Sequence, residues 1–184
     1  MGGPGLEQQL TDRHGREIIL REAEEGDAVP VLAFVRHVDR ESTFLSREPG
    51  EFAASEIQER QHISMLRGRT GSIMLLALHD GELVGAIDFS GGTRRRNVHA
   101  GEFGLSVRRP YWGAGIGGML LDAMLVWARG TGFIHKVRLR VQDRNVAAIA
   151  LYRSRGFEEE GRLAREMRVD GEWVDLVMMG LWLP

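Results

Sequence analysis

Glycines crowd the segment Val107–Leu121, whose sequence is V-R-R-P-Y-W-G-A-G-I-G-G-M-L-L. They stand where a strand pattern changes into that of an amphipathic helix, at Gly113, Gly115, Gly117 and Gly118. A turn without Cβ atoms lets several backbone N–H groups point at one anion, and the helix adds its unpaired N–H groups and the positive end of its dipole. The segment therefore predicts a phosphate or pyrophosphate site. The alternative is a tight turn that binds nothing.

The turn G-A-G-I-G-G also satisfies the G-x-G-x-x-G pattern of dinucleotide-binding sites. A lone match of this kind is weak evidence. The elements before it indicate an antiparallel meander, whereas a Rossmann site opens a βαβ unit. About seventy residues follow, too few for the remaining parallel strands of a doubly wound sheet. The sequence therefore disfavours a dinucleotide site.

The elements around this turn are expected in the order β-αα-βββ-α-β-α-ββ, a mixed α/β domain. Asp80-Gly81 and Asp170-Gly171 are typical turns of β-hairpins. We find no repeat and no linker, so the prediction is one domain over residues 1–184, with a loose tail at 1–14. The expected strands are 16–21, 72–79, 82–89, 97–107, 136–141, 158–169 and 172–183, and the expected helices are 27–37, 51–67, 115–129 and 145–155.

Composition narrows the function further. Apolar residues make up 43% of the 184 residues, enough for a real core. A net charge of −2 argues against a general binder of nucleic acid or membrane surfaces. The chain has no cysteine, and its histidines lack metal-ligand spacing, so we expect no disulfide and no metal site. With no membrane span and no apolar signal core, a cytoplasmic location is expected.

Two motifs in order resemble the GNAT acetyltransferase superfamily. The stretch W-G-A-G-I-G-G before an amphipathic helix resembles the family's acyl-CoA motif Q/R-x-x-G-x-G/A, with Trp112 in the Q/R position and Gly115 and Gly117 at the glycine positions. Residues 145–157 resemble the family's N-x-x-A-x-x-x-Y-x-x-x-G-F helix. The resemblance covers most of the chain and implies the GNAT fold, in which two central strands splay apart.

The resemblance also implies which residues bind acetyl-CoA. The amides of the glycine turn would wrap the pyrophosphate, and the strand before the turn would pair its backbone with the pantetheine arm and hold the thioester oxygen. Asn145 would contact the amide arm, although a plain helix cap is an equally good interpretation. The implied cofactor-binding residues are Leu105, Ser106, Val107, Gly113, Ala114, Gly115, Ile116, Gly117, Gly118, Asn145 and Tyr152.

Tyr152 and Glu102 are the catalytic residues that the resemblance implies. Tyr152 matches the general acid that protonates the leaving thiolate, and its alternative is an aromatic ring that packs the helix on the sheet. Glu102 matches a frequent glutamate that takes the amine's proton directly or through a water. Its alternatives are a solvated carboxylate or one that only holds a cationic substrate.

The implied reaction is direct attack of a small primary amine on acetyl-CoA, with an amino acid, a polyamine or a related amine as acceptor. Protein N-termini, lysine side chains and aminoglycosides stay open. In ribosomal-protein alanine acetyltransferases a catalytic glutamate stands five residues before the cofactor asparagine, and Arg140 takes that position here. A rival of another class is an acyl-CoA-binding sensor without turnover. A homodimer is possible because relatives are often dimers.

Overall fold

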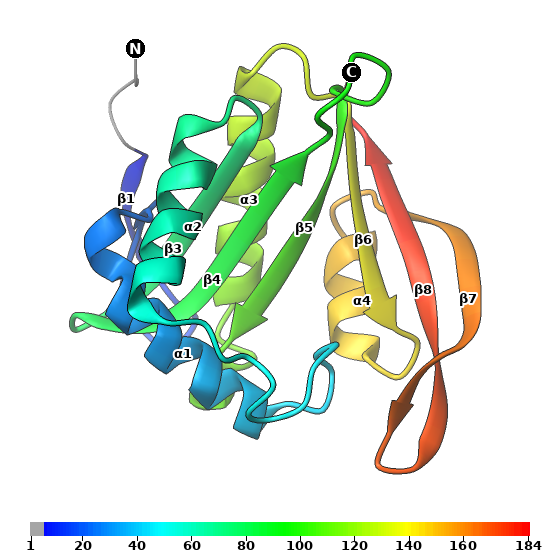
Figure 1. The fold of residues 1–184 in the computed structure, drawn as a ribbon, viewed down its shortest axis with the longest axis horizontal. Helices are drawn as coiled ribbons and strands as arrows, with labels where there is room; N and C mark the ends of the chain where they lie inside the picture. The colour runs from blue at the N-terminus through cyan, green and yellow to red at the C-terminus, as the bar shows by residue number, and fades with distance from the viewer. Residues whose placement is uncertain (1–5) are drawn as a thin grey trace.

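A computed structural model describes residues 6–184. One mixed eight-stranded sheet runs through it in the order β1-β2-β3-β4-β5-β6-β8-β7, with helices on both faces (Figure 1). All neighbouring strands are antiparallel except β5 and β6, which are parallel. The expected mixed α/β fold is confirmed.

The observed elements follow the expected order, with one more strand at the start. The strands are β1 (Glu7–Thr11), β2 (Glu17–Glu22), β3 (Ser72–His79), β4 (Glu82–Gly91), β5 (Ala100–Val107), β6 (Lys136–Gln142), β7 (Glu158–Val169) and β8 (Glu172–Trp182). The α-helices are α1 (Ala28–Glu41), α2 (Glu56–Gly68), α3 (Ile116–Gly130) and α4 (Val146–Arg153). Both expected hairpin turns are present, and Asp80 and Asp170 have positive φ.

The N-terminal segment corrects the expectation of a loose tail over 1–14. Residues 7–11 form β1, which pairs antiparallel with β2 at the edge of the sheet. The turn between the two strands is tied by the Asp12 carboxylate, which accepts hydrogen bonds from the backbone N–H groups of His14 and Arg16 at 2.8 and 3.0 Å. Residues 1–5 of the expected tail lie outside the described residues.

Helix α2 begins later than the expected start at residue 51. Ser55 caps it, and its side chain accepts a hydrogen bond from the Gln58 N–H while the Gln58 side chain accepts one from the Ser55 N–H. This reciprocal pair is a capping box, and it fixes the first turn. Residues 42–55 therefore form a longer connection between α1 and α2 than the sequence indicates.

Two apolar cores lie on opposite faces of the sheet. Helix α3 packs on one face, with Leu120, Leu121 and Met124 fully buried. Helices α1 and α2 pack on the other face, where Phe34, Ile63 and Leu76 are buried. Because side chains alternate along a strand, every central strand sends residues to both cores. We call these the α3 face and the α2 face.

Strands β5 and β6 pair over a short stretch and then separate. Their pairing runs only from Ala100 and Lys136 to Glu102 and Arg138, although β5 continues to Val107 and β6 to Gln142. The two ribbons diverge toward the end of the sheet that carries the start of α3 (Figure 1). The splayed central pair predicted from the family resemblance is confirmed, and it leaves one edge of β5 unpaired.

Candidate active site

The glycine turn has the backbone form that an anion site needs. Gly113 and Gly115 have φ of 76° and 95°, in the left-handed region that side chains disfavour. Gly115 is the residue before helix α3, whose first N–H groups have no acceptor within the helix. No hydrogen bond to a residue in 6–184 is donated by the N–H groups of Gly113, Gly115, Ile116, Gly117 and Gly118. Such free donors fit a pyrophosphate.

The turn is held from two sides. The Arg13 N–H, in the β1–β2 turn, donates to the Ala114 carbonyl at 3.0 Å, and the Arg13 side chain lies over Gly115. Trp112 donates from its indole Nε1 to the Val107 carbonyl at 2.7 Å. The residue in the family's Q/R position thus joins the end of β5 to the turn. These contacts keep the turn in one conformation without using its free N–H groups.

The turn, the splayed edge of β5 and helix α4 meet at Gly117. A Cβ added to Gly117 would lie 3.5 Å from Leu151 on α4 and 3.8 Å from both Leu105 and Val107 on β5. Leu105, Ser106 and Val107 belong to the part of β5 that no longer pairs with β6. The structure therefore brings the implied pyrophosphate and pantetheine residues together.

Asn145 is the residue before helix α4, and it caps that helix. Its side-chain oxygen accepts a hydrogen bond from the Ala148 N–H at 3.2 Å. The capping interpretation is confirmed. It uses only the amide oxygen, so the amide nitrogen is still available to a ligand at the mouth of the splay.

Tyr152 lies on the α3 face and is 7% exposed. Its ring makes an edge contact with Phe103 at a centroid distance of 5.7 Å and a tilted contact with Phe157 at 5.9 Å. Burial raises the pKa of the Tyr152 phenol to about 12, so the hydroxyl stays protonated at neutral pH. The ring of Tyr152 therefore packs helix α4 on the sheet, and its phenol carries a proton that it could donate.

Glu102 lies on the α2 face, because its neighbour Phe103 packs against Tyr152 on the opposite face. Its Oε1 lies 2.9 Å from Nε of Arg140 on β6, and both side chains are about half exposed. Glu102 and Tyr152 therefore approach the splay from opposite faces of the sheet. This arrangement is compatible with a base and an acid on two sides of one reaction centre.

The sequence did not single out Asp88, which lies beside Glu102 on the α2 face. Strand register pairs Asp88 with Gly104 and Ser90 with Glu102. Burial raises the pKa of the Asp88 carboxyl, which the charges of His62 and Arg47 partly offset. An acidic residue in the otherwise apolar stretch Leu83–Phe89 was the available signal.

Two further features border this face. The connection 42–55 is tied to the end of β6, because Gln142 donates from Nε2 to the Thr43 carbonyl at 2.9 Å. Glu59 on α2 is 4% exposed, and burial raises the pKa of its carboxyl. Glu59, Asp88 and Glu102 therefore place three carboxyl groups on the α2-face side of the splay, near the basic side chains of Arg47 and Arg140.

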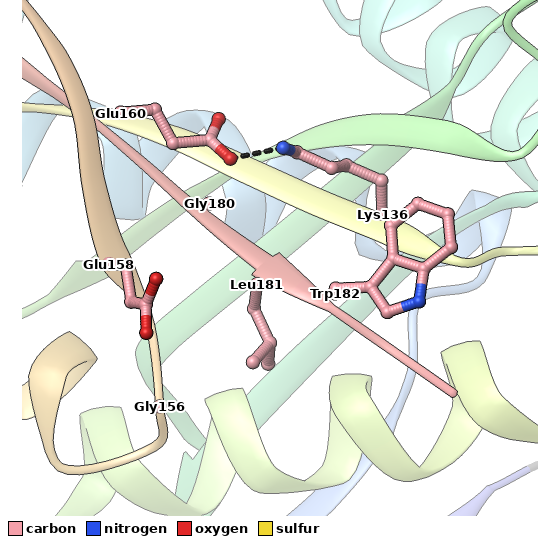
Figure 2. A pocket seen from close by; sticks show the side chains of 7 residues that line it. All are labelled: Lys136, Gly156, Glu158, Glu160, Gly180, Leu181 and Trp182. Atoms are coloured by element: carbon pink, nitrogen blue, oxygen red, sulfur yellow. Dashed lines mark hydrogen bonds and ion pairs between the residues drawn. The ribbon is translucent and has the colours of Figure 1, made fainter.

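A separate hollow lies between β6, β7 and β8 (Figure 2). Lys136 and Glu160 form an ion pair across it, and none of the predicted site residues lines it. Within residues 6–184, no group of three or more His, Asp or Glu side chains is placed to hold a metal ion. In the same range, no helix is long and apolar enough to cross a membrane.

The chain is similar in sequence to known acetyltransferases and in structure to a solved one. The chain is 30% identical over 114 residues to the L-amino acid N-acetyltransferase AaaT of Escherichia coli (strain K12), which spans 62% of this chain and 70% of the relative. It is 29% identical over 119 residues to the [Ribosomal protein uS5]-alanine N-acetyltransferase of the same organism, which spans 63% and 61%. A crystal structure of a GNAT-family acetyltransferase from Streptococcus pneumoniae superposes with a TM-score of 0.88 at 30% identity, over 91% of this chain and all of that one.

The family model for the Acetyltransferase (GNAT) family matches residues 32–157. That range contains the splayed strands, the glycine turn and helix α4 with Asn145 and Tyr152. The free N–H groups of the turn and the unpaired edge of β5 agree with this match. The chain belongs to the GNAT family of acetyltransferases.

Proposed function

We propose that this protein transfers the acetyl group of acetyl-CoA to the primary amine of a small molecule. The splay of β5 from β6 beside five free backbone N–H groups is the observation that carries the proposal. Acetyl-CoA would supply an activated thioester, whose acetyl carbon bonds to the amine nitrogen as the C–S bond breaks.

The glycine turn would hold the pyrophosphate through the free N–H groups of Gly113 and of residues 115–118. The unpaired edge of Leu105, Ser106 and Val107 would bind the pantetheine arm as an added strand, because no strand within residues 6–184 pairs with it on that side. A backbone N–H of this edge would also stabilise the negative charge that develops on the thioester oxygen. Asn145 would contact the arm through its free amide nitrogen.

Glu102 and Tyr152 would move the two protons of the reaction. Glu102 would accept the amine's proton through its outer oxygen or a water, since Arg140 occupies Oε1. Tyr152 would donate its proton to the leaving sulfur and regain one from solvent. Because burial keeps this phenol neutral, it is a donor throughout the physiological pH range.

A small amine is favoured as the acceptor by the neighbouring carboxyl groups of Asp88 and Glu102 on the α2 face, which suit a cation. The L-amino acid specificity of the AaaT relative supports the same class. A protein N-terminus is the alternative, supported by the uS5-alanine relative, although Arg140 replaces the glutamate of that type. Lysine side chains and aminoglycosides are further alternatives. The homodimer and the cytoplasmic location stay predictions.

Release of CoA from acetyl-CoA, measured with a panel of amines, tests the proposal. The panel contains L-amino acids, polyamines, an aminoglycoside and a peptide with an N-terminal alanine. We expect turnover of an amino acid or polyamine and little of the peptide. Binding of acetyl-CoA without turnover of any amine would support the sensor instead. The Tyr152→Phe variant is the control for enzyme-catalysed release.

A further inference from the structure

Asp88 lies at the point where the central strands separate. It pairs across the sheet with Gly104, which follows the last paired residue of β5, Glu102, by two positions. Residues two apart on a strand share a face, so Asp88, Gly104 and Glu102 all belong to the α2 face. Diagonal neighbours on paired strands are about 7–8 Å apart. One amine nitrogen between Asp88 and Glu102 can therefore approach both carboxylates.

Gly104 leaves the Asp88 carboxylate open. A Cβ added to Gly104 would lie 3.1 Å from Asp88 Oδ1 and 4.0 Å from the Cγ of the same carboxylate, and no other atom of residues 6–184 beyond its chain neighbours would lie within 4 Å. Gly104 itself is exposed. A side chain at this position would cover Asp88, whereas glycine leaves the side of the carboxylate next to β5 uncovered.

No charged group in residues 6–184 forms an ion pair with the Asp88 carboxylate. Glu102 forms an ion pair with Arg140, whereas Asp88 forms none with any residue in 6–184. His62 on α2 and Arg47 in the connection 42–55 act on it only at longer range, and Glu59 on α2 adds a like charge. The flanking position on β3 is the neutral Met74. A partly buried carboxylate without a contacting cation is costly, which leaves a place for a cation from outside.

We propose that Asp88 binds the protonated amino group of the acceptor and positions it beside Glu102. The inference rests on the proposed function, since it assigns a specificity residue to the same reaction. Asp88 provides the charge that recognises an ammonium, and Glu102 removes the proton. This division explains why, of the two neighbouring strand carboxylates Asp88 and Glu102, only Glu102 is held by an arginine.

Steady-state kinetics of Asp88→Asn at saturating acetyl-CoA test the assignment. Two acceptors are compared at neutral pH: the amine that the wild type acetylates fastest, and its aminooxy analogue, whose amino group is uncharged. We expect the KM for the charged amine to rise about 10- to 100-fold, because a hydrogen bond to a charged group is lost. The KM for the aminooxy analogue should change about threefold or less, because its amino group carries no charge. The KM for acetyl-CoA should stay near that of the wild type.

Two further variants complete the test. Asp80→Asn, an exposed aspartate in the β3–β4 turn, is the matched control and should leave both KM values unchanged. Gly104→Ala keeps Asp88 but covers it, and should raise the KM of the charged amine selectively. Equal changes for both acceptors, or none, would overturn the role of Asp88. A wild type that acetylates no amine would instead contradict the proposed function itself.

Discussion

Arg140 on β6, two residues beyond the last paired position of that strand, holds Glu102, the last paired residue of β5, through an ion pair of 2.9 Å. The pair bridges the strands that then separate to form the splay. Because Arg140 takes Oε1, the other oxygen of Glu102 is oriented and available to an incoming proton. An exposed ion pair of this kind contributes little to stability, typically about 0–1 kcal/mol. Its orientation of Glu102 is therefore its more important effect.

Glu102→Gln should lower kcat about 100-fold, because the amide cannot accept the amine's proton. The thermal midpoint should change little, since the lost ion pair is exposed. Rates with a saturating amine and scanning calorimetry measure the two effects. Glu172→Gln is a matched control, because Glu172 also pairs with an arginine, Arg144, at 2.8 Å on the surface. A rate equal to that of the wild type would remove Glu102 as the base.

Tyr152→Phe should lower kcat at neutral pH by about 100-fold or more, because the leaving thiolate loses its proton donor. Phenylalanine preserves the contacts with Phe103 and Phe157, so the fold and the affinity for acetyl-CoA should persist. Stopped-flow kinetics measure the effect on the rate, and equilibrium binding measures the affinity for acetyl-CoA. Tyr111→Phe removes the only other phenol of the chain and should keep kcat. An unchanged kcat in Tyr152→Phe would leave the ring as packing alone.

The same residue should make stability depend on alkaline pH. The pKa of Tyr152 is 10.0 in the unfolded chain and about 12 in the folded one, so the folded state binds more protons between these values. Its contribution is complete below pH 10 and is lost as pH rises toward 12, by about 2–3 kcal/mol. Urea unfolding across this range should show a steeper decline in the wild type than in Tyr152→Phe. Parallel curves would contradict the burial of the phenol.

Gly115→Ala should weaken acetyl-CoA binding about tenfold or more. Alanine at a φ of 95° costs about 1–2 kcal/mol and turns the free N–H groups of the turn away from a common target. Gly81→Ala is a matched control, because Gly81 has a φ of 79° in the β3–β4 hairpin, where a Cβ meets nothing within 4 Å. Both variants should lose similar stability, and calorimetric titration should show weaker binding only in Gly115→Ala. Weaker binding in both would point to a global effect.

The sequence predicts those parts of the candidate site that are local along the chain. The turn 113–118 and the helix with Asn145 and Tyr152 each lie within one short segment, so the resemblance to two family motifs marks them. Ser55 and Gln58 also carried a local signal, the capping box, yet the apolar stripe favoured an earlier helix start. Features that depend on one short segment could therefore be predicted from the sequence where the motif in that segment was recognised.

Features that depend on pairing between strands could not be read in the same way. Asp88 becomes a site residue only through its register opposite Gly104, sixteen positions later in the chain. Strand β1 has the polar sequence E-Q-Q-L-T and is stabilised by pairing with β2 and by the contact of Arg13 with Ala114. Propensity scarcely distinguishes such an edge strand from a tail, because its stability comes from its neighbours.

Gln142→Met tests whether the connection between α1 and α2 shapes the acceptor side. Gln142 is 3% exposed, and its amide donates to the Thr43 carbonyl at 2.9 Å. Methionine keeps the volume but removes the donor, which should lower the free energy of unfolding by about 1 kcal/mol. The charge of Arg47 in this connection lowers the pKa of Asp88. A released connection should therefore leave less of Asp88 ionised and raise the KM for the acceptor, while the KM for acetyl-CoA stays unchanged. Gln61→Met, on the exposed side of α2, is the control. A loss of stability with an unchanged acceptor KM would limit Gln142 to a structural role.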